Sequence, residues 1–194
     1  MKRHMMILLT WTGLLTLSVI MGCSTTGTGN SQAATQTAEE NPANSQAVAS
    51  LRAMIADGQA YTTEQIMPLY DQLDEVDLDT MIGTWKGGKF DGGKGPDPIN
   101  WYGKRFNSPS YVEPLLARKP DGTVYSFDKW GMAQMREVKF RGKISATLIY
   151  DLKPIMDYFR KLDDNTLIGL GETKGHLTFF FYLTRDDEKD KNQG

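Results

Sequence analysis

Two aromatic residues, a glycine and two basic residues follow one another in the string WYGKR at positions 101–105. Lys104 and Arg105 could bind a carboxylate or a headgroup, while the ring faces of Trp101 and Tyr102 support the positive charge from the side. The same two cations could equally form ion pairs with acidic residues across a sheet. The string therefore predicts either an anion site or a structural charge network, and both interpretations stay open.

Two aspartates, Asp151 and Asp157, form a second candidate group. Glycoside hydrolysis uses two carboxylates, one of which acts as the general acid. Because Arg160 is close in the sequence and could pair with either aspartate, a structural role fits them better than an acid–base pair. Arg160 is itself a candidate for an inward-facing cation, since apolar and aromatic residues surround it in the sequence.

The composition excludes several kinds of chemistry. The 194 residues include one cysteine, two histidines, 22 basic and 24 acidic residues. A single cysteine forms no intrachain disulfide, and so few histidines cannot build a multi-histidine zinc site. The balanced charge argues against nucleic acid as a partner. We therefore expect no metal or nucleotide chemistry, and no cofactor is predicted.

The N-terminus has the pattern of an export signal. Two basic residues precede an apolar run over 5–21, which predicts a signal peptide at 1–22. A membrane-spanning helix is the alternative, but the unbroken apolar length is shorter than the roughly 20 residues that a bilayer core requires. The string IMGC at 20–23 resembles the lipobox of bacterial lipoproteins, which implies cleavage before Cys23 and acylation of that cysteine with palmitate-type chains.

The residue after Cys23 is Ser24, which resembles lipoproteins that are sorted to the outer membrane. We therefore expect a protein of the bacterial cell envelope that is lipid-anchored to the outer membrane and faces the periplasm.

The rest of the chain divides by composition. Residues 23–46 comprise the lipidated cysteine and a small, polar stretch that predicts a disordered tether. Apolar residues at helical spacing predict two short helices within 47–80, and Pro68 is expected to kink or shorten the second. A β-rich domain over 81–186 and a charged tail at 187–194 complete the chain.

The β-rich domain is marked by β-branched and aromatic runs separated by turn residues. The expected strands are 82–90, 111–117, 123–127, 135–140, 144–150, 166–170 and 177–184, with a strand or short helix at 155–161. Turn signals such as Arg141-Gly142 and Lys174-Gly175 lie between them. This pattern predicts a mainly β (α+β) fold: an antiparallel lipocalin-like or nitrobindin-like β-barrel preceded by two short helices.

The last expected strand is apolar on both faces. Phe179 and Phe181 share one face, and Phe180 and Tyr182 share the other. The N-terminal helices could cover the outer face. The inner face would then line either a packed core or a ligand pocket, because barrels of this size allow both.

Three strings in the chain resemble one known family. They are GTWKG at 83–87, WYGKRF at 101–106, and YDLKPIMDYFR at 150–160 with Gly169 after it. Together they resemble the GXWXG protein family and the domain of unknown function 4334 that usually follows it, with halves at about 81–130 and 131–186. The resemblance implies a small β-rich domain without an established activity or agreed catalytic residues.

Lipocalin-like and nitrobindin-like proteins begin with a similar G-x-W string. The resemblance implies that Trp85 closes one end of the barrel as a core plug. A nitrobindin-like protein would use a late histidine as a haem ligand, which in this sequence could only be His176. Its position in a turn favours exposure to solvent.

We predict that the barrel binds a hydrophobic or amphipathic small molecule, with an aromatic wall and Arg105 or Arg160 as the polar anchor. An envelope lipoprotein that binds another protein, as an inhibitor or immunity factor does, is the alternative, and an enzyme is less favoured. Haem binding is a further alternative. The predicted ligand-binding residues are Trp85, Trp101, Tyr102, Lys104, Arg105, Tyr150, Asp151, Asp157, Arg160, Phe179 and Phe181.

Overall fold

The computed structural model describes residues 41–186 of the chain. The predicted signal peptide, Cys23, most of the predicted tether and the charged tail at 187–194 lie outside the described residues. Over residues 41–186, none of the helices has the length and apolar character needed to cross a membrane.

Three helices precede the sheet: α1 (Pro42–Asp57), α2 (Thr63–Gln72) and α3 (Leu78–Met81). α1 begins at Pro42, so residues 42–46, which were expected to belong to the tether, are helical. The Asn41 side chain caps α1 by accepting a hydrogen bond from the Ala43 amide. Proline is favoured at the first helical position because its φ is already helical and it has no amide proton to satisfy.

A capping box starts α2: Gln65 Oε1 accepts from the Thr62 amide at 2.9 Å. The helix continues through Pro68, which therefore does not end it. The single-turn helix α3 was not predicted from the sequence, because four residues are too few to show a helical period.

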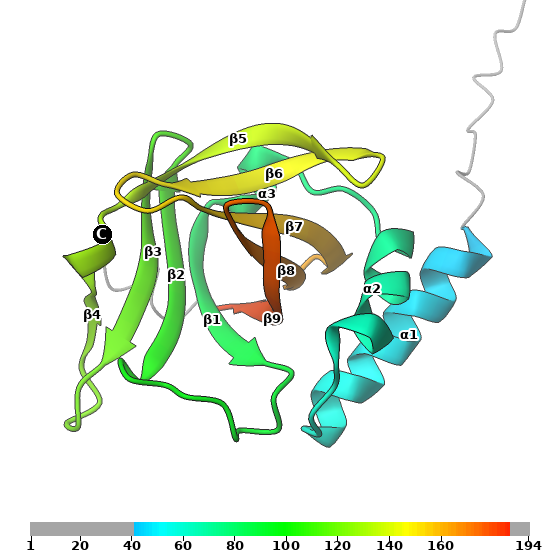
Figure 1. The fold of residues 1–194 in the computed structure, drawn as a ribbon, viewed down its shortest axis with the longest axis horizontal. Helices are drawn as coiled ribbons and strands as arrows, with labels where there is room; N and C mark the ends of the chain where they lie inside the picture. Colours follow the sequence, from blue (N-terminus) through cyan, green and yellow to red (C-terminus); the bar gives the residue numbers. More distant parts are fainter. Residues whose placement is uncertain (1–40, 187–194) are drawn as a thin grey trace, which may run out of the picture. The chain divides into compact units, whose positions relative to one another are not determined.

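Nine antiparallel strands follow within the described residues. They are β1 (Gly83–Lys89), β2 (Trp101–Ser108), β3 (Tyr111–Arg118), β4 (Val124–Ser126), β5 (Ala133–Phe140), β6 (Lys143–Tyr150), β7 (Ile155–Asp163), β8 (Thr166–Thr173) and β9 (His176–Arg185). Eight of them form a closed ring in the order β2-β1-β9-β8-β7-β6-β5-β3, and β3 pairs back with β2. The short strand β4 pairs with β3 outside this ring (Figure 1).

The closed antiparallel barrel confirms the predicted fold class. The segment 155–161, left open as a strand or helix, is part of strand β7. Strand β2 was not among the predicted strands, because a glycine and two charged residues interrupt its alternation. Hairpin turns form at the two predicted dipeptides, Arg141-Gly142 and Lys174-Gly175. All four residues have positive φ, as this type of two-residue hairpin turn requires.

One end of the barrel is closed by a plug. Trp85 is fully buried and donates from Nε1 to the carbonyl of Met81 in α3 at 2.7 Å. The Arg185 guanidinium lies 4.2 Å from the centre of the Trp85 indole and donates to the carbonyls of Thr80 and Ile82. Trp85 therefore packs in the core, as the sequence predicted, and holds α3 across this end.

The other end of the barrel is formed by the ends of β1, β3, β6 and β8 and by the starts of β2, β5, β7 and β9. This antiparallel arrangement brings the 90–100 loop, the 127–130 segment and the β6–β7 and β8–β9 turns around one opening. We refer to this end as the mouth.

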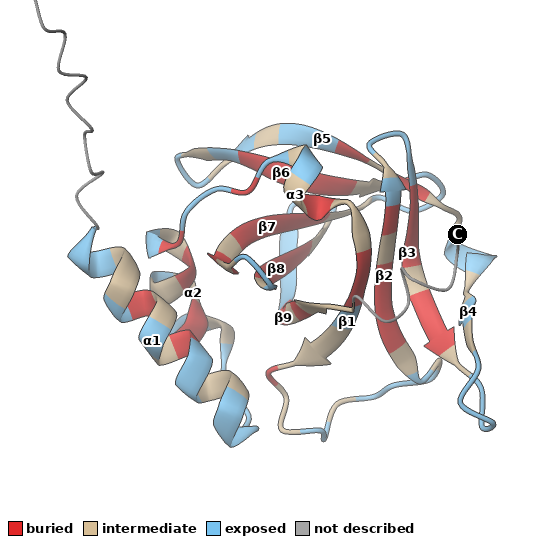
Figure 2. Ribbon diagram, turned by 180° about the vertical axis from the view of Figure 1, so that it is seen from behind, coloured by how far each residue is buried: buried red, intermediate tan, exposed pale blue. Residues whose placement is uncertain are grey.

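Helices α1 and α2 cover the outside of the barrel. Leu51 of α1 and Ile66 of α2 pack with Leu170 of β8 and Phe180 of β9 in a second apolar cluster, separate from the barrel interior. Figure 2 shows buried residues on both helices next to exposed ones. The prediction that β9 is buried on both faces and covered by helices is confirmed at Phe180 and Phe181, which belong to the outer and inner clusters respectively.

Candidate ligand-binding site at the barrel mouth

A cavity of about 560 Å³ opens at the mouth of the barrel. A volume of this size is typical of small-molecule pockets. Its wall is mostly apolar, and strands β1, β2, β3, β6, β7, β8 and β9 contribute to it. The residues that line this mouth cavity are Lys89, Pro96, Asp97, Pro98, Ile99, Trp101, Lys104, Leu115, Phe127, Lys129, Trp130, Tyr150, Ile155, Asp157, Gly171, Thr173, Thr178, Phe179 and Phe181.

The GXWXG string positions one side of this wall. Gly87 lies beneath the indole of Trp101, because a Cβ atom at Gly87 would come within 2.4 Å of that ring. Gly103 has φ +155°, and a Cβ there would come within 1.9 Å of the Trp85 carbonyl oxygen. The two glycines therefore let β1 and β2 approach closely and seat Trp101 against the sheet. The Trp101 Nε1–H donates to the Gly103 carbonyl at 2.9 Å and fixes the ring.

Lys104 extends from β2 into the interior and is only 3% exposed. Its Nζ atom lies 2.8 Å from Asp157 Oδ2, 3.0 Å from the Pro114 carbonyl oxygen and 3.2 Å from the Tyr150 hydroxyl. These are three oxygen atoms, as many as an ammonium group has protons. Lys104 is thus already surrounded by partners within the fold.

Aromatic rings enclose the same ammonium group. Lys104 Nζ lies 5.1 Å from the centre of the Phe181 ring, 5.5 Å from that of Tyr150 and 5.8 Å from that of Trp101. The electron-rich ring faces stabilise a cation that has lost its hydration shell. The aromatic residues therefore support the buried charge as well as forming the apolar wall.

Asp157 projects from β7 and is 4% exposed. Its Oδ2 atom forms a buried ion pair with the Lys104 ammonium group. Burial, together with the negative charge and hydrogen bond of Asp157, raises the pKa of Tyr150 well above its usual value, so its hydroxyl stays protonated. The interior thus contains a cluster of Lys104, Tyr150 and Asp157, which we call the polar cluster.

Strand β9 supplies the opposite wall. Phe181 packs edge-to-face against both Trp101 and Phe159, with ring centres 5.8 and 5.9 Å apart. Phe179, nearer the mouth, is 52% exposed and also lines the cavity. A register shift between β8 and β9 near Leu170 explains why Thr178 and Phe179 both line the cavity, although a regular strand would point them to opposite faces.

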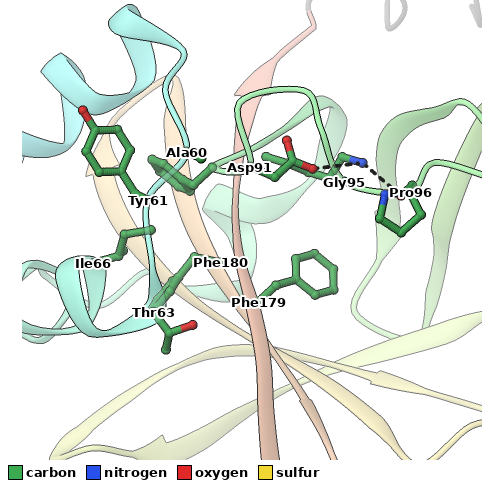
Figure 3. Close-up of a pocket in the computed structure, with 11 residues that line it drawn as sticks. Ala60, Tyr61, Thr63, Ile66, Asp91, Gly95, Pro96, Phe179 and Phe180 are labelled. Atoms are coloured by element: carbon green, nitrogen blue, oxygen red, sulfur yellow. Dashed lines mark hydrogen bonds and ion pairs between the residues drawn. The ribbon is translucent and has the colours of Figure 1, made fainter.

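A second cavity of about 490 Å³ lies beside the first, between the α1–α2 connection and the β1–β2 loop (Figure 3). Ala60, Ile66 and Phe180 contribute to its apolar wall, and Phe179 lines both cavities. Lys89 bridges the loop by contacting Asp91 at 3.5 Å and the Pro96 carbonyl at 3.3 Å. These bonds hold the rim of the loop in place between the two cavities.

Six of the predicted binding residues lie together in the mouth cavity. They are Trp101, Lys104, Tyr150, Asp157, Phe179 and Phe181. Five others lie elsewhere: Trp85, Tyr102, Arg105, Asp151 and Arg160.

The two arginines considered as polar anchors do not line this cavity. Arg105 donates to Glu113 at 2.9 Å and to Thr84 at 3.3 Å. Arg160 is 1% exposed, donates to the carbonyls of Phe140 and Phe159, and lies 5.1 Å from the Tyr70 ring of α2. Strand alternation explains the position of Arg160: Asp157 and Phe159 point inward, so Arg160, which follows Phe159, points outward.

The other residues outside the cavity have structural partners. The Tyr102 hydroxyl donates to Asp186 and its ring lies 4.8 Å from Arg118. Asp151 is exposed in the β6–β7 turn, so Asp151 and Asp157 do not form a carboxylate pair in one site. His176 is exposed at the start of β9 and does not line either cavity. Within the described residues, no group of three or more metal-ligating side chains is present.

Sequence reasoning missed several wall residues, including Leu115, Phe127, Trp130 and Ile155. Their apolar character alone does not separate wall residues from core residues. The inward alternation of β3 could have indicated Leu115, but the bulges between β2 and β3 shift that pattern.

Two family matches cover most of the barrel. Residues 68–122 match the family described as GXWXG protein, and residues 131–185 match the domain of unknown function DUF4334. A crystal structure of a protein from Thermomonospora curvata is 43% identical, with a TM-score of 0.67, and the match covers 73% of this chain and 99% of that chain. The chain belongs to the GXWXG protein family.

In this GXWXG protein the first matched region contains β1 to β3 and the second contains β5 to β9. The predicted family resemblance is therefore confirmed, as is its order along the chain. No match was found among the curated proteins. The mouth cavity draws Trp101 and Lys104 from the first region and Tyr150, Asp157 and Phe181 from the second, so the site requires both.

Proposed function

We propose that this GXWXG protein binds a hydrophobic or amphipathic small molecule in the mouth cavity. The observation that carries the proposal is the buried polar cluster at the inner end of an apolar cavity of about 560 Å³. A packed core does not need a charged pair, because burying two charges costs free energy that apolar side chains would avoid. A pocket with an apolar wall and a few polar groups is the usual arrangement for a small-molecule site.

In the proposed complex the apolar part of the ligand lies against Trp101, Phe179 and Phe181. Its polar group contacts the cluster of Lys104, Tyr150 and Asp157. Aromatic walls bind apolar groups by excluding water, and the buried polar cluster determines which end of the ligand enters first.

The test is saturable binding of the neutral fluorescent probe N-phenyl-1-naphthylamine to the purified chain. Thr173→Trp fills the mouth from strand β8 and is expected to weaken probe binding by about tenfold or more, because the indole occupies ligand space. Thr166→Trp is the matched control, since Thr166 starts the same strand at the plugged end. Its probe affinity should equal that of the unmodified chain.

If the folded chain shows no saturable binding, ligand binding is excluded and protein binding becomes the better proposal. A specific observation favours that second candidate: Trp130 and Leu152 near the mouth are 43% and 69% exposed. Large exposed apolar side chains of this kind are typical of protein contact sites. If Thr173→Trp and Thr166→Trp bind the probe equally well, the probe binds outside the mouth cavity.

The proposal also includes a lipid anchor at Cys23 on the outer membrane, facing the periplasm, which rests on the sequence alone. Two or more acyl chains hold a protein stably on a membrane. Cys23→Ser is expected to abolish acyl labelling and to release the protein from the membrane fraction, whereas Ser24→Ala should keep the label. A Cys23→Ser variant that retains its acyl label and stays with the membranes after a salt wash would contradict the anchor.

A further inference from the structure

The interior of the mouth cavity is neutral overall, although it contains charges. Lys104 and Asp157 form a buried pair at 2.8 Å, and each is exposed by less than a tenth. The other charged residues of the wall lie at the rim: Lys89 is 3.9 Å from Asp97, and Lys129 is exposed. A ligand that reaches the polar cluster therefore meets a dipole and no net charge.

The hydrogen-bonding capacity of the polar cluster is unequal. The Lys104 ammonium group has three oxygen neighbours within 3.2 Å, so it has no proton left for a ligand. The Tyr150 hydroxyl accepts a hydrogen bond from Lys104 and is also hydrogen-bonded to Asp157. The Asp157 carboxylate has about four lone-pair sites, of which the contacts with Lys104 and Tyr150 occupy two, so it is the member of the cluster that can accept a further hydrogen bond in the cavity that Asp157 lines.

This arrangement discriminates between ligand headgroups. A carboxylate would place a second acceptor with a negative charge against the Asp157 carboxylate, and the charge of Lys104 is already compensated. An ammonium ligand would approach Lys104, which occupies the space between the three aromatic rings. A neutral hydroxyl group can donate to the Asp157 carboxylate and brings no charge into a low-dielectric cavity.

We propose that the ligand of the mouth cavity is a neutral, largely apolar alcohol, whose hydroxyl group donates a hydrogen bond to the Asp157 carboxylate. This inference rests on the proposed function, because it names the ligand class of the same site. It replaces the expectation of an acidic ligand held by an arginine, since neither Arg105 nor Arg160 lines the cavity.

The test compares three competitors with the same alkyl chain: 1-dodecanol, 1-methoxydodecane and dodecanoic acid. Each displaces N-phenyl-1-naphthylamine from the unmodified chain at about pH 8, where the acid is ionised. The alcohol is expected to bind about tenfold more tightly than the ether, which cannot donate, and than the carboxylate. A carboxylate or an ether that competes as well as the alcohol overturns the inference.

Asp157→Asn then tests the role of the aspartate. The variant keeps the side-chain size and leaves the charge of Lys104 uncompensated, so dodecanoic acid should become the tightest of the three competitors. Asp97→Asn is the matched control, because Asp97 is an acidic wall residue at the rim, and the order of the three competitors should stay that of the unmodified chain. An unchanged order in a folded Asp157→Asn variant would contradict the inference.

The ranking in the unmodified chain decides the inference even if Asp157→Asn does not fold. The two proposals also fail differently. If the probe itself does not bind saturably, the proposed function fails and the inference falls with it. If the probe binds and the carboxylate is the best competitor, only the ligand class is wrong.

Discussion

The two ends of the barrel are built from the same eight strands but are filled differently. At the plugged end, Trp85 is fully buried, and its only polar atom is bonded to the Met81 carbonyl. At the mouth, Trp101 is partly exposed and lines a cavity that also contains the buried pair of Lys104 and Asp157. The difference shows that an aromatic residue in this barrel can serve either packing or a cavity wall, depending on what closes the end.

The helix α3 provides the physical cause of this difference. It lies across the plugged end and is held there by Arg185, which donates to the carbonyls of Thr80 and Ile82. At the mouth, the loop at 90–100 and the 127–130 segment, which contains a single turn of 3-10 helix (Asp128–Trp130), form a rim around an open cavity. The plug therefore contributes to stability, whereas the mouth leaves room for a ligand.

The largest expected effects on stability and binding come from two separate variants, in each of which one of the two tryptophans is replaced by alanine. Trp85→Ala should lower the free energy of unfolding by about 3–5 kcal/mol, because it removes a fully buried indole and leaves a cavity. Trp101→Ala should cost less stability but weaken N-phenyl-1-naphthylamine binding, since the indole is part of the wall. Urea denaturation and probe titration of both variants measure the two effects. Equal stability losses, or unchanged probe binding in Trp101→Ala, would remove the distinction between the two ends.

A smaller effect is expected at the other buried cation. Arg160→Met should cost about 1–3 kcal/mol of unfolding free energy, because the buried carbonyls of Phe140 and Phe159 lose their donors. Probe affinity should not change, since Arg160 lies under α2 and outside the mouth cavity. Lys104→Met is the comparison variant, in which probe affinity should change. A binding defect in folded Arg160→Met would show that the outer face also contributes to the site.

The smallest expected effect is a change in alkaline stability. Burial and the hydrogen bond to Asp186 raise the pKa of Tyr102 to about 12, from an ordinary value of 10. Because the pKa is higher in the folded state, the contribution of Tyr102 is fully present below pH 10 and is lost as the pH rises toward 12.

Tyr102→Phe should therefore reduce the loss of melting temperature between pH 10 and pH 12. The reduction is partial, because Tyr70, Tyr150 and Tyr158 also have raised pKa values and remain. Probe binding should be unaffected at neutral pH, since Tyr102 does not line the cavity. A variant with the same alkaline melting profile as the unmodified chain would contradict this assignment.

Local patterns predicted most of the fold because each depends on few neighbouring residues. The Lys174-Gly175 turn, for example, forms as expected. The start of α1 was missed because the prediction used large apolar residues, whereas the helix begins at a cap formed by Asn41 and a proline. Strand β2 was missed because glycine and charged residues obscure its alternation.

Only part of the candidate site was predicted, namely the residues that stand in recognisable local patterns. Trp101 and Lys104 are neighbours in a distinctive string, and Phe181 lies in an unmistakably apolar strand. The choice of polar anchor depends on which side of a strand faces inward. At β7 that choice separates Asp157 from Arg160, and nothing in the local composition decides it.

The sequence by itself determined the β-rich domain, the family strings, the predicted signal at the N-terminus and the small inventory of reactive side chains. The tertiary structure alone decided that Lys104 pairs with Asp157, because those residues come from strands β2 and β7, which lie on opposite sides of the ring. It also decided that one end of the barrel is filled and the other is hollow. Both outcomes depend on closure of the ring, which brings distant strands to face each other across a common interior and is not encoded in any single local pattern.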